Sequence, residues 1–322
     1  MTLAVVICTY NHAALLDGAL AALAAQVSPS DARWSALVVD NNCTDDTAAV
    51  VARHQASGAI PGLRRVEERR QGLTPARLRG VRESDADWVV FVDDDCRLAP
   101  DWVRRAAAVA AAHPDAGAFG GRVVLDWERP PPDWVRRYGY AFAEQDHGEA
   151  PVEVGYLVGA GLAVRRDALD ACGWTHRQYL GDRVGRRLVS GGDMEITLRL
   201  RGAGYPLWYA PDLVLRHAIP DARTSLPYLL AMQYGLGKSQ QHVDALCWGG
   251  SYPGWVRASL GALARETAGV ARQGLRALAR RRAATDARLA WRFLLGRWAG
   301  WAALVARGPR GPALLGQAAP TS

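Results

Sequence analysis

The stretch DWVVFVDDDC, residues 87–96, joins a run of apolar side chains to three consecutive aspartates. Four apolar residues precede Asp93, which predicts a strand that is buried on both faces, as in a parallel sheet covered by helices. Adjacent carboxylates disfavour one another's negative charge, so three of them at a strand end need a physical reason. Either they form a solvated loop that caps the following helix, or they offer hard oxygen ligands to Mg²⁺ or Mn²⁺.

The chain upstream of this stretch alternates between short β-branched runs and amphipathic segments. Strands are predicted at residues 3–8, 35–41 and 63–68, and helices at residues 13–25, 44–54 and 74–84. This alternation is typical of βαβ units and predicts a doubly wound, mostly parallel α/β sheet. Ligands bind such sheets beyond the carboxyl ends of the strands, so the polar clusters that follow the first, second and fourth strands are expected to converge there.

The composition is that of a globular protein with a substantial core, because 49% of the 322 residues are hydrophobic and 22% are charged. The five cysteines lie far apart without a C-x-x-C pair or zinc-like spacing, so neither a disulfide scaffold nor a structural zinc site is expected. The first residues predict a strand rather than a signal peptide, and the apolar runs are too short to span a bilayer. We therefore expect a cytoplasmic protein, either free or attached to the inner face of the plasma membrane.

Residues 255–310 differ from the rest of the chain, with twelve arginines against Glu266 and Asp286, a net charge of +10. Apolar residues recur among them at helical spacing, at Leu260, Leu263, Val270, Leu275, Leu278, Leu289, Phe293, Leu294, Trp298 and Trp301. Amphipathic helices are therefore predicted, and two roles remain open for them. Their apolar face could pack on the rest of the protein or on a second subunit, or it could lie in the headgroup layer of an anionic membrane.

Six sequence blocks resemble, in this order, the family 2 glycosyltransferases of the GT-A fold. They are VVICTYN (5–11), VVDNNCTDDT (38–47), RRQGLTPARLRG (69–80), FVDDDC (91–96), GAGLAVRR (159–166) and GGDMEITLRLRGAGYPLWYAPDLVLRH (191–217). The resemblance implies a nucleotide-diphospho-sugar donor, with a UDP-sugar favoured, and Mn²⁺ or Mg²⁺ on the D-x-D sequence. It also implies transfer with inversion to a hydroxyl group of a glycan, a lipid-linked intermediate or a small molecule, in the synthesis of cell-surface polysaccharides or glycoconjugates.

The resemblance covers about residues 3–240 and implies a Rossmann-like GT-A domain in two halves, followed by a helical tail. Residues 1–120 are expected to bind the nucleotide sugar, residues 121–245 to hold the acceptor and the catalytic base, and residues 246–322 to form the arginine-rich tail. The Q-x-x-R-W block of processive synthases is missing from the sequence, so a single, non-processive transfer is expected.

Several residues of the first half are expected to bind the donor and the metal. The donor residues are Thr9, Tyr10, Asn11, Asp40, Arg70, Asp93 and Asp94, and the metal ligands are Asp95, Asp93 and His217. In this interpretation Asp40 accepts a hydrogen bond from a base N–H while Tyr10 packs on its ring. Asp40 could instead cap the turn before Thr44, Arg70 could be a solvated charge, and a lone histidine is more often structural.

The resemblance also implies that Asp193 is the base that deprotonates the acceptor hydroxyl. Its alternative role is to cap the predicted helix that ends near Gly202. Position 192 departs from the family pattern, because an acidic residue is common there and this chain has glycine.

Glu195, Trp134 and Gly161 are expected to contact the acceptor. Residues 126–144 combine three prolines with Trp127, Trp134, Tyr138 and Tyr140, whose rings could stack on a sugar or a lipid, although Trp134 could pack against the sheet instead. The family often has asparagine where Gly161 stands, so the resemblance is weakest there.

Two rival functions share parts of this sequence pattern. A nucleotidyltransferase would share the sheet and the paired aspartates, but it would carry a glycine-rich basic loop where this chain reads CTYNHAALL, residues 8–16. A basic-tailed protein that binds nucleic acid or a membrane agrees with the sequence pI near 9.4, but the body is slightly acidic and contains no recognisable nucleic-acid module. No nucleic-acid partner is therefore expected, and an anionic membrane surface is retained as a partner of the tail.

Overall fold

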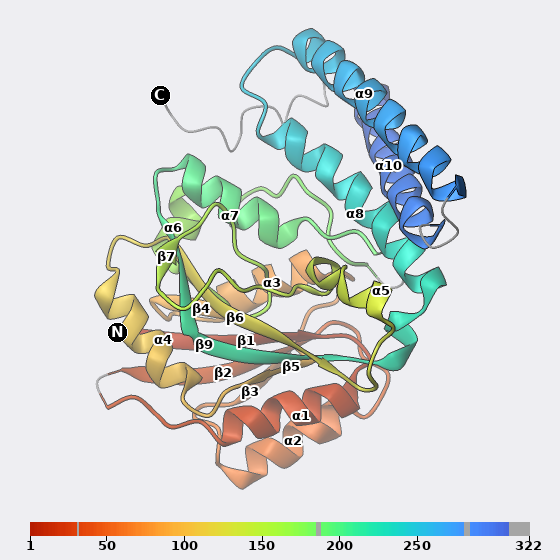
Figure 1. Ribbon diagram of the computed structural model, residues 1–322. Coiled ribbons are helices and arrows are strands. Elements are labelled where there is room, and N and C mark those ends of the chain that lie inside the picture. The colour runs from red at the N-terminus through yellow and green to blue at the C-terminus, as the bar shows by residue number, and fades with distance from the viewer. Residues whose placement is uncertain (31, 185–187, 280–283, 309–322) are drawn as a thin grey trace.

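The computed structural model describes residues 1–30, 32–184, 188–279 and 284–308 (Figure 1). A central sheet lies between two layers of helices, and its strand order is β3-β2-β1-β4-β8-β6-β9-β5, with β7 paired to β9. The strands are β1 (Thr2–Thr9), β2 (Arg33–Asp40), β3 (Arg64–Glu67), β4 (Trp88–Asp93), β5 (Cys96–Leu98), β6 (Ala118–Trp127), β7 (Val152–Glu153), β8 (Leu162–Arg165) and β9 (Leu207–Ile219).

The half of the sheet formed by β1 to β4 is parallel, as the βαβ pattern of the sequence predicts. The register pairs Thr9 with Asp40, Asp40 with Glu67, and Cys8 with Asp93, so the carboxyl ends of these strands lie level at one edge. Beyond β4 the sheet is mixed, because β8 is antiparallel to both β4 and β6, whereas β9 is parallel to β6. The expectation of a mostly parallel α/β sheet is confirmed.

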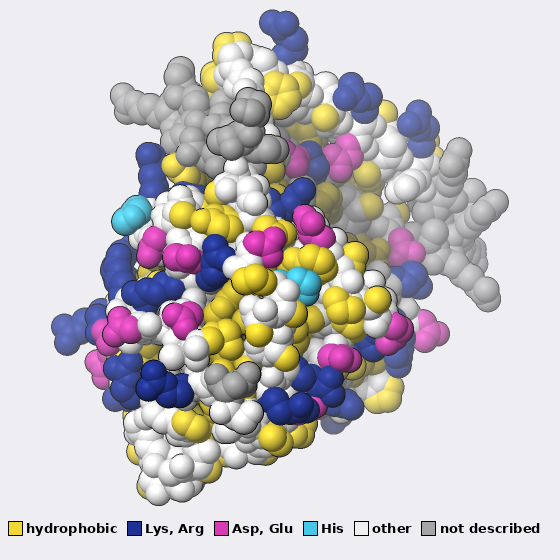
Figure 2. Space-filling model, turned by 90° about the vertical axis from the view of Figure 1, so that its left-hand side faces the viewer, with side chains coloured by type: hydrophobic (Ala, Val, Ile, Leu, Met, Phe, Trp, Pro, Cys, Tyr) yellow, Lys and Arg dark blue, Asp and Glu magenta, His cyan; other side chains and the backbone are white. Residues whose placement is uncertain are grey.

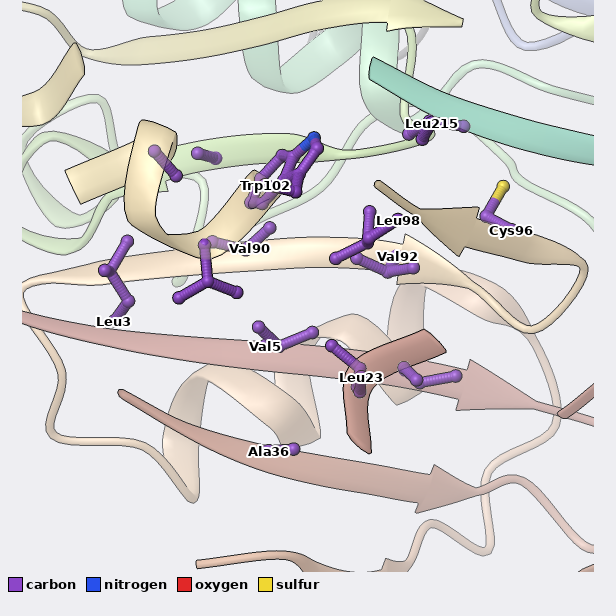
Figure 3. Packing of buried hydrophobic residues seen from close by; sticks show 14 of the residues in the cluster. Leu3, Val5, Leu23, Ala36, Val90, Val92, Cys96, Leu98, Trp102 and Leu215 are labelled. Carbon is purple, nitrogen blue, oxygen red and sulfur yellow. The ribbon is translucent and has the colours of Figure 1, made fainter. Parts of the chain in front are cut away.

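Helices cover both faces of the sheet because successive strand residues point to opposite sides. Val5 of β1 and Val90 of β4 pack with Trp102 beneath α1, α2 and α4 (Figure 3). Val6 and Val89 pack on the other side, with α3, α6 and α7. The helices are α1 (Ala13–Ala24), α2 (Thr47–Ser57), α3 (Leu73–Arg82), α4 (Trp102–Ala112), α5 (Asp133–Arg136), α6 (Arg166–Ala171), α7 (Gly192–Gly202), α8 (Leu226–Leu246), α9 (Tyr252–Ala279) and α10 (Ala284–Ala306), with 3₁₀ turns η1 (Gly139–Phe142) and η2 (Asp221–Thr224).

One local prediction was wrong, and one of the alternatives left open by the sequence is excluded. The helix predicted from Thr44 begins at Thr47, because Thr44 donates its backbone N–H to Asn11 Oδ1 and is held in a loop at the strand ends. The three aspartates after β4 do not cap the next helix, because strand β5 follows them and Asp101 is the residue that precedes α4.

The tail packs on the body through a close seam between α10 and α8 (Figure 1). A Cβ atom built on Gly296 would lie 2.1 Å from the backbone oxygen of Tyr234, and one on Gly237 would lie 2.0 Å from that of Phe293. Arg297 of α10 adds ion pairs to Asp244 at 2.8 Å and to Glu266 at 3.2 Å. The packing role predicted as one alternative is therefore present in α10.

The described helices include none that combines the length and the apolar character needed to cross a bilayer. Residues 280–283 and 309–322 of the predicted tail lie outside the described residues, and so does the side chain of Leu278.

Candidate active site

A cavity of about 1390 Å³ opens at the carboxyl ends of β1 and β4. Its floor is formed by residues that the sequence placed at these strand ends, namely Thr9, Tyr10, Asn11, Asp93, Asp94 and Asp95. Its opposite wall comes from α8 and from the tail, including Met232, Gln240 and Phe293. The cavity therefore reaches from the parallel half of the sheet to the helices that close the chain.

The first two aspartates after β4 have different environments. Asp94 is buried, accepts a hydrogen bond of 2.7 Å from Thr9 Oγ1 and lies 3.2 Å from His12 Nδ1. Burial raises the pKa of Asp94 although the hydrogen bond from His12 opposes this, and the same hydrogen bond raises the pKa of His12. Asp93 is more open, with 35% of its side chain exposed and an oxygen 3.8 Å from Arg77 Nη2. Asp94 thus ties β4 to the loop after β1, and Asp93 is free to meet a ligand.

Asp95 lies between two cationic side chains. Its Oδ2 atom is 3.1 Å from His217 Nε2 and 3.0 Å from Arg223 Nη1. Strand pairing explains the contact with the histidine, because Cys96 of β5 is the register partner of His217 in β9. Burial alone would raise the pKa of Asp95, but the neighbouring His217 and Arg223 hold it well below its usual range.

The donor atoms around Asp95 fit a divalent cation. Asp95, Cys96 and His217 each place a ligand atom within 4.8 Å of the others. The Nδ1 atom of His217 lies 2.7 Å from the backbone oxygen of Phe142, which leaves Nε2 to face Asp95 and a metal. The Cys96 thiol lies 3.7 Å from Asp95 Oδ1, but burial raises the pKa of this thiol well above the usual value, so it is a poor ligand. Carboxylate oxygens with one imidazole nitrogen suit Mn²⁺ or Mg²⁺.

Two arginines of the site were not singled out from the sequence. Arg77 of α3 is almost fully buried, with Asp182 at 3.4 Å and the ring of Phe91 at 5.4 Å. Arg223 of η2 contacts Asp95, and its Nε and Nη2 atoms have no hydrogen-bond partner among the described residues. Arg77 lies in the quoted block of residues 69–80 and could have been found there, whereas Arg223 lies outside the six blocks.

Asp193 lies in the first turn of α7 and lines the cavity. Its Oδ2 atom accepts a hydrogen bond of 2.9 Å from the backbone N–H of Gly159, and its Oδ1 atom accepts one from Met194. The residue that precedes the helix is Gly191, so Asp193 is not its N-cap. The contact with Gly159 joins Asp193 to the segment before β8 and orients its carboxylate.

Glu195, expected on the acceptor side, lies outside the cavity lining. It is fully buried and accepts hydrogen bonds from the backbone N–H groups of Tyr179 at 2.9 Å and Leu180 at 2.7 Å. Burial raises the pKa of Glu195 although these hydrogen bonds and Arg199 oppose the shift. The helical period turns Glu195 away from Asp193, two positions earlier, and makes it an anchor for the preceding loop.

Gly161 and Trp134, the other expected acceptor residues, also lie outside the cavity lining. Gly161 has a φ of +72°, and a Cβ atom there would lie 2.5 Å from Leu215 Cδ2, so the backbone requires glycine. Trp134 packs against the buried cluster that contains Phe142 and Ile219. Of the aromatic residues in the proline-rich segment, Tyr138, Tyr140 and Phe142 line the cavity instead.

Asp40 and Arg70, expected to bind the donor, are not brought to the cavity. Asp40 is buried, pairs with Arg65 and accepts a hydrogen bond of 2.8 Å from the backbone N–H of Cys43, which is the turn-capping alternative. Arg70 is exposed. Their neighbours Asn41 and Gln71 line the cavity in their place.

Residues 4–173 match the model of the family described as Glycosyl transferase family 2. The chain is similar to glycosyltransferase AglE of Haloferax volcanii, at 28% identity over 74% of this chain and 73% of that protein. It is also similar to glucosyl-dolichyl phosphate glucuronosyltransferase of the same organism, at 26% identity over 55% of this chain and 57% of that protein.

A solved structure shares the fold. The mannosyltransferase PcManGT from Pyrobaculum calidifontis, in complex with GDP-Man and Mn²⁺, matches 95% of this chain and 74% of its own, with a TM-score of 0.56 and 22% identity. This likeness supports the GT-A architecture. The family match covers more than half of the chain and includes the strand ends that form the cavity floor. The chain belongs to glycosyl transferase family 2.

Proposed function

We propose that this glycosyltransferase moves one sugar at a time, with inversion and with the help of a divalent cation, from a nucleotide-diphospho-sugar to an acceptor hydroxyl. The observation that carries this proposal is that Asp93, Asp95, His217 and Asp193 line one cavity although they come from distant parts of the chain. A metal-binding group and a candidate base on a shared cavity are what direct displacement at an anomeric carbon requires.

The donor side is built from the parallel half of the sheet. Asp95 and His217, with Asp93, would hold Mn²⁺ or Mg²⁺, which supplies charge stabilisation to the departing diphosphate. Tyr10 is 40% exposed at the cavity floor and offers its ring to the base. Arg223 lines the cavity beside Asp95, and its positive charge suits the phosphate oxygens of the donor. A UDP-sugar is the favoured donor.

Asp193 is the proposed base. It takes the proton of the acceptor hydroxyl while the hydroxyl oxygen forms a bond to the anomeric carbon and the bond from that carbon to the diphosphate breaks. Attack from the face opposite the leaving group inverts the configuration of the sugar. The N–H of Gly159 orients the carboxylate for this transfer.

The acceptor is proposed to be a glycan or a lipid-linked intermediate of glycoconjugate or polysaccharide synthesis, bound at the inner face of the plasma membrane. Tyr138, Tyr140 and Tyr156 give the cavity an aromatic wall suited to a sugar ring. The name of one relative, glucosyl-dolichyl phosphate glucuronosyltransferase, supports a lipid-linked acceptor. The arginine-rich tail forms the cavity wall through Phe293 and would bring the site to an anionic surface.

Binding of UDP and GDP, measured by calorimetry with and without Mn²⁺, tests the donor side. We expect Mn²⁺ to strengthen binding of one of them in the wild type and to have no effect in Asp95→Ala. Asp115→Ala, which changes an exposed aspartate elsewhere, should keep the metal effect. A panel of UDP- and GDP-sugars assayed for hydrolysis with Mn²⁺ then identifies the donor. Metal dependence that survives in Asp95→Ala, or no turnover of any nucleotide sugar, contradicts the proposal.

A further inference from the structure

Asp182 occupies the space beside Gly192 at the start of α7. A Cβ atom built on Gly192 would lie only 2.3 Å from Asp182 Oδ2 and 3.4 Å from Thr74 Oγ1. The backbone of Gly192 does not adopt a positive φ, so contact, rather than conformation, excludes a side chain there. By ordinary bond lengths, a carboxylate oxygen of an aspartate lies about 2.4 Å from its own Cβ atom. The Asp182 oxygen therefore lies about as far from this Cβ position as an oxygen of an aspartate at position 192 would lie.

This carboxylate is held in place from two sides. Its Oδ2 atom pairs with Arg77 Nη1 at 3.4 Å, and its Oδ1 atom accepts the backbone N–H of Arg183 at 2.9 Å. Glu195 holds the segment just before it, through the N–H groups of residues 179 and 180. A buried carboxylate fixed in this way is a built part of the cavity wall and not a mobile surface group.

Arg77 connects Asp182 to the proposed base. A Cβ atom built on Gly159 would lie 2.7 Å from Arg77 Nη2 and 3.2 Å from Asp193 Oδ2, so the guanidinium and the base carboxylate meet at this glycine. A third carboxylate also lies near Arg77, because Asp93 Oδ1 is 3.8 Å from its Nη2 atom. Without Asp182, the buried charge of Arg77 would have to be balanced by Asp193 and Asp93 alone.

We propose that Asp182 is a positioning residue for the transfer reaction: it supplies, from the loop before α7, the carboxylate that the chain lacks at position 192, and it holds Arg77 so that Asp193 stays available as the base. The inference rests on the proposed function of Asp193. Burial, opposed by Arg77 and assisted by Asp193, raises the pKa of Asp182 to about 6, as expected for a carboxylate in a crowded acidic site.

Moving the carboxylate from position 182 to position 192 tests the inference. We expect Asp182→Ala to lower kcat for hydrolysis of the nucleotide sugar by about 10-fold or more, because small displacements of catalytic groups are costly. The Kd for the nucleotide diphosphate with Mn²⁺ should change little. Adding Gly192→Asp to Asp182→Ala should restore kcat to within about 3-fold of the wild type. The matched control, Asp182→Ala with Gly192→Ala, fills the same space without a charge and should remain as slow as Asp182→Ala.

Thermal unfolding of the same variants separates placement from catalysis. In the wild-type background Gly192→Asp and Gly192→Ala should both lower the Tm, whereas in the Asp182→Ala background neither should lower it further. Wild-type turnover in Asp182→Ala, or equal rates in the two double variants, overturns the positioning role. If the substitutions at Gly192 lower the Tm equally in both backgrounds, Asp182 does not occupy the space beside Gly192. If the wild type turns over no nucleotide sugar, the proposed function fails and the positioning role with it, but the Tm series still decides the placement.

Discussion

At the scale of single residues, each of the three aspartates after β4 has different surroundings. Their mutual repulsion is relieved in three different ways, since Asp93 remains partly exposed, Asp94 takes hydrogen bonds from Thr9 and His12, and Asp95 pairs with cations. Consecutive residues point in different directions, so each carboxylate meets a different wall of the cavity. The repulsion that makes the triplet unusual in a sequence is largely removed by partners that the fold brings to it.

At this scale, Asp193→Asn should lower kcat by roughly 10²-fold or more, because the amide keeps the shape of the side chain but cannot accept the proton of the acceptor. The affinity for the nucleotide diphosphate with Mn²⁺ should stay unchanged, because Asp193 is proposed to act on the acceptor and not on the donor. Steady-state kinetics and calorimetry check the two parts, with Asp115→Asn as the control. A variant with nearly normal turnover would leave Asp193 with a structural role, as the acceptor of the backbone N–H groups of Gly159 and Met194.

The pair of His12 and Asp94 predicts a pH dependence of stability. The hydrogen bond to Asp94 raises the pKa of His12 above its ordinary value of 6.5, so its stabilising effect is fully present below pH 6.5 and is lost as the pH rises through the raised value. Urea unfolding at pH 6 should therefore show a larger difference between wild type and His12→Ala than at pH 9. The effect should stay below about 1 kcal/mol, because the histidine is 55% exposed and solvent screens the pair. A difference that grows with pH, or one matched by His176→Ala at an exposed site, would contradict this assignment.

At the scale of elements, α10 is held to α8 by backbone contact and not only by side chains. Gly296 and Gly237 let the two helices approach so closely that added methyl groups would meet backbone oxygens. Leu289, Leu294 and Leu304 of α10 are buried, which anchors the helix along its length. The tail therefore contributes to the folded body as well as to the cavity wall.

Gly296→Ala should destabilise the protein by about 1–3 kcal/mol, the usual cost of forcing an extra carbon into a closely packed place. Gly269→Ala is the matched control, since Gly269 lies in the helix α9 with no atom within 4 Å of its added Cβ. Alanine there should be neutral or stabilising by up to about 1 kcal/mol, because glycine weakens helices. Urea unfolding of both variants measures the contrast, and equal effects would show that the seam is looser than described.

The whole molecule combines a body of mixed charge with a basic helical tail. Acidic and basic side chains are interspersed over the body in Figure 2, whereas α9 and α10 carry exposed arginines, among them Arg257, Arg265, Arg272 and Arg288. Exposed Leu275 and Trp291 border an apolar groove of about 520 Å³ between the same helices. Basic and apolar groups together suit the headgroup layer of an anionic membrane.

The protein should therefore cosediment with anionic liposomes at low salt and be released as ionic strength rises, because each basic residue near such a surface contributes about 1 kcal/mol. Arg265→Gln with Arg272→Gln should weaken binding, whereas Arg33→Gln with Arg82→Gln, the same charge change at exposed sites of the body, should not. A truncation of the tail after Gly254 would be a poorer test of membrane binding. It would remove α10 and nearly all of α9 and so expose the buried face of α8. Equal weakening by both pairs would indicate net charge alone, and no binding by the wild type would leave the tail as a packing element.

The sequence by itself determined the parallel half of the sheet, its strand ends and the family. Apolar alternation is a local property, so it placed β1, β2, β3 and β4 and put Thr9, Tyr10 and the three aspartates at one edge. Asp193 and His217 were found because they lie in blocks that resemble a known family. The triplet itself was recognised because charges that repel one another are informative without any knowledge of the fold.

Only the tertiary structure decided which of the polar residues face the cavity. Asp40 and Glu195 bind partners outside the cavity. Position 161 must be glycine because the side chain of Leu215, more than fifty positions away, occupies the space where a Cβ atom would lie. Arg77 and Asp182 are 105 positions apart, and Asp95 and Arg223 are 128 apart, so no local pattern could have paired them. The spacing of residues in the sequence indicates on which face of a helix or strand a side chain lies. The orientation of a buried charged side chain depends instead on the opposite charge that the fold places beside it.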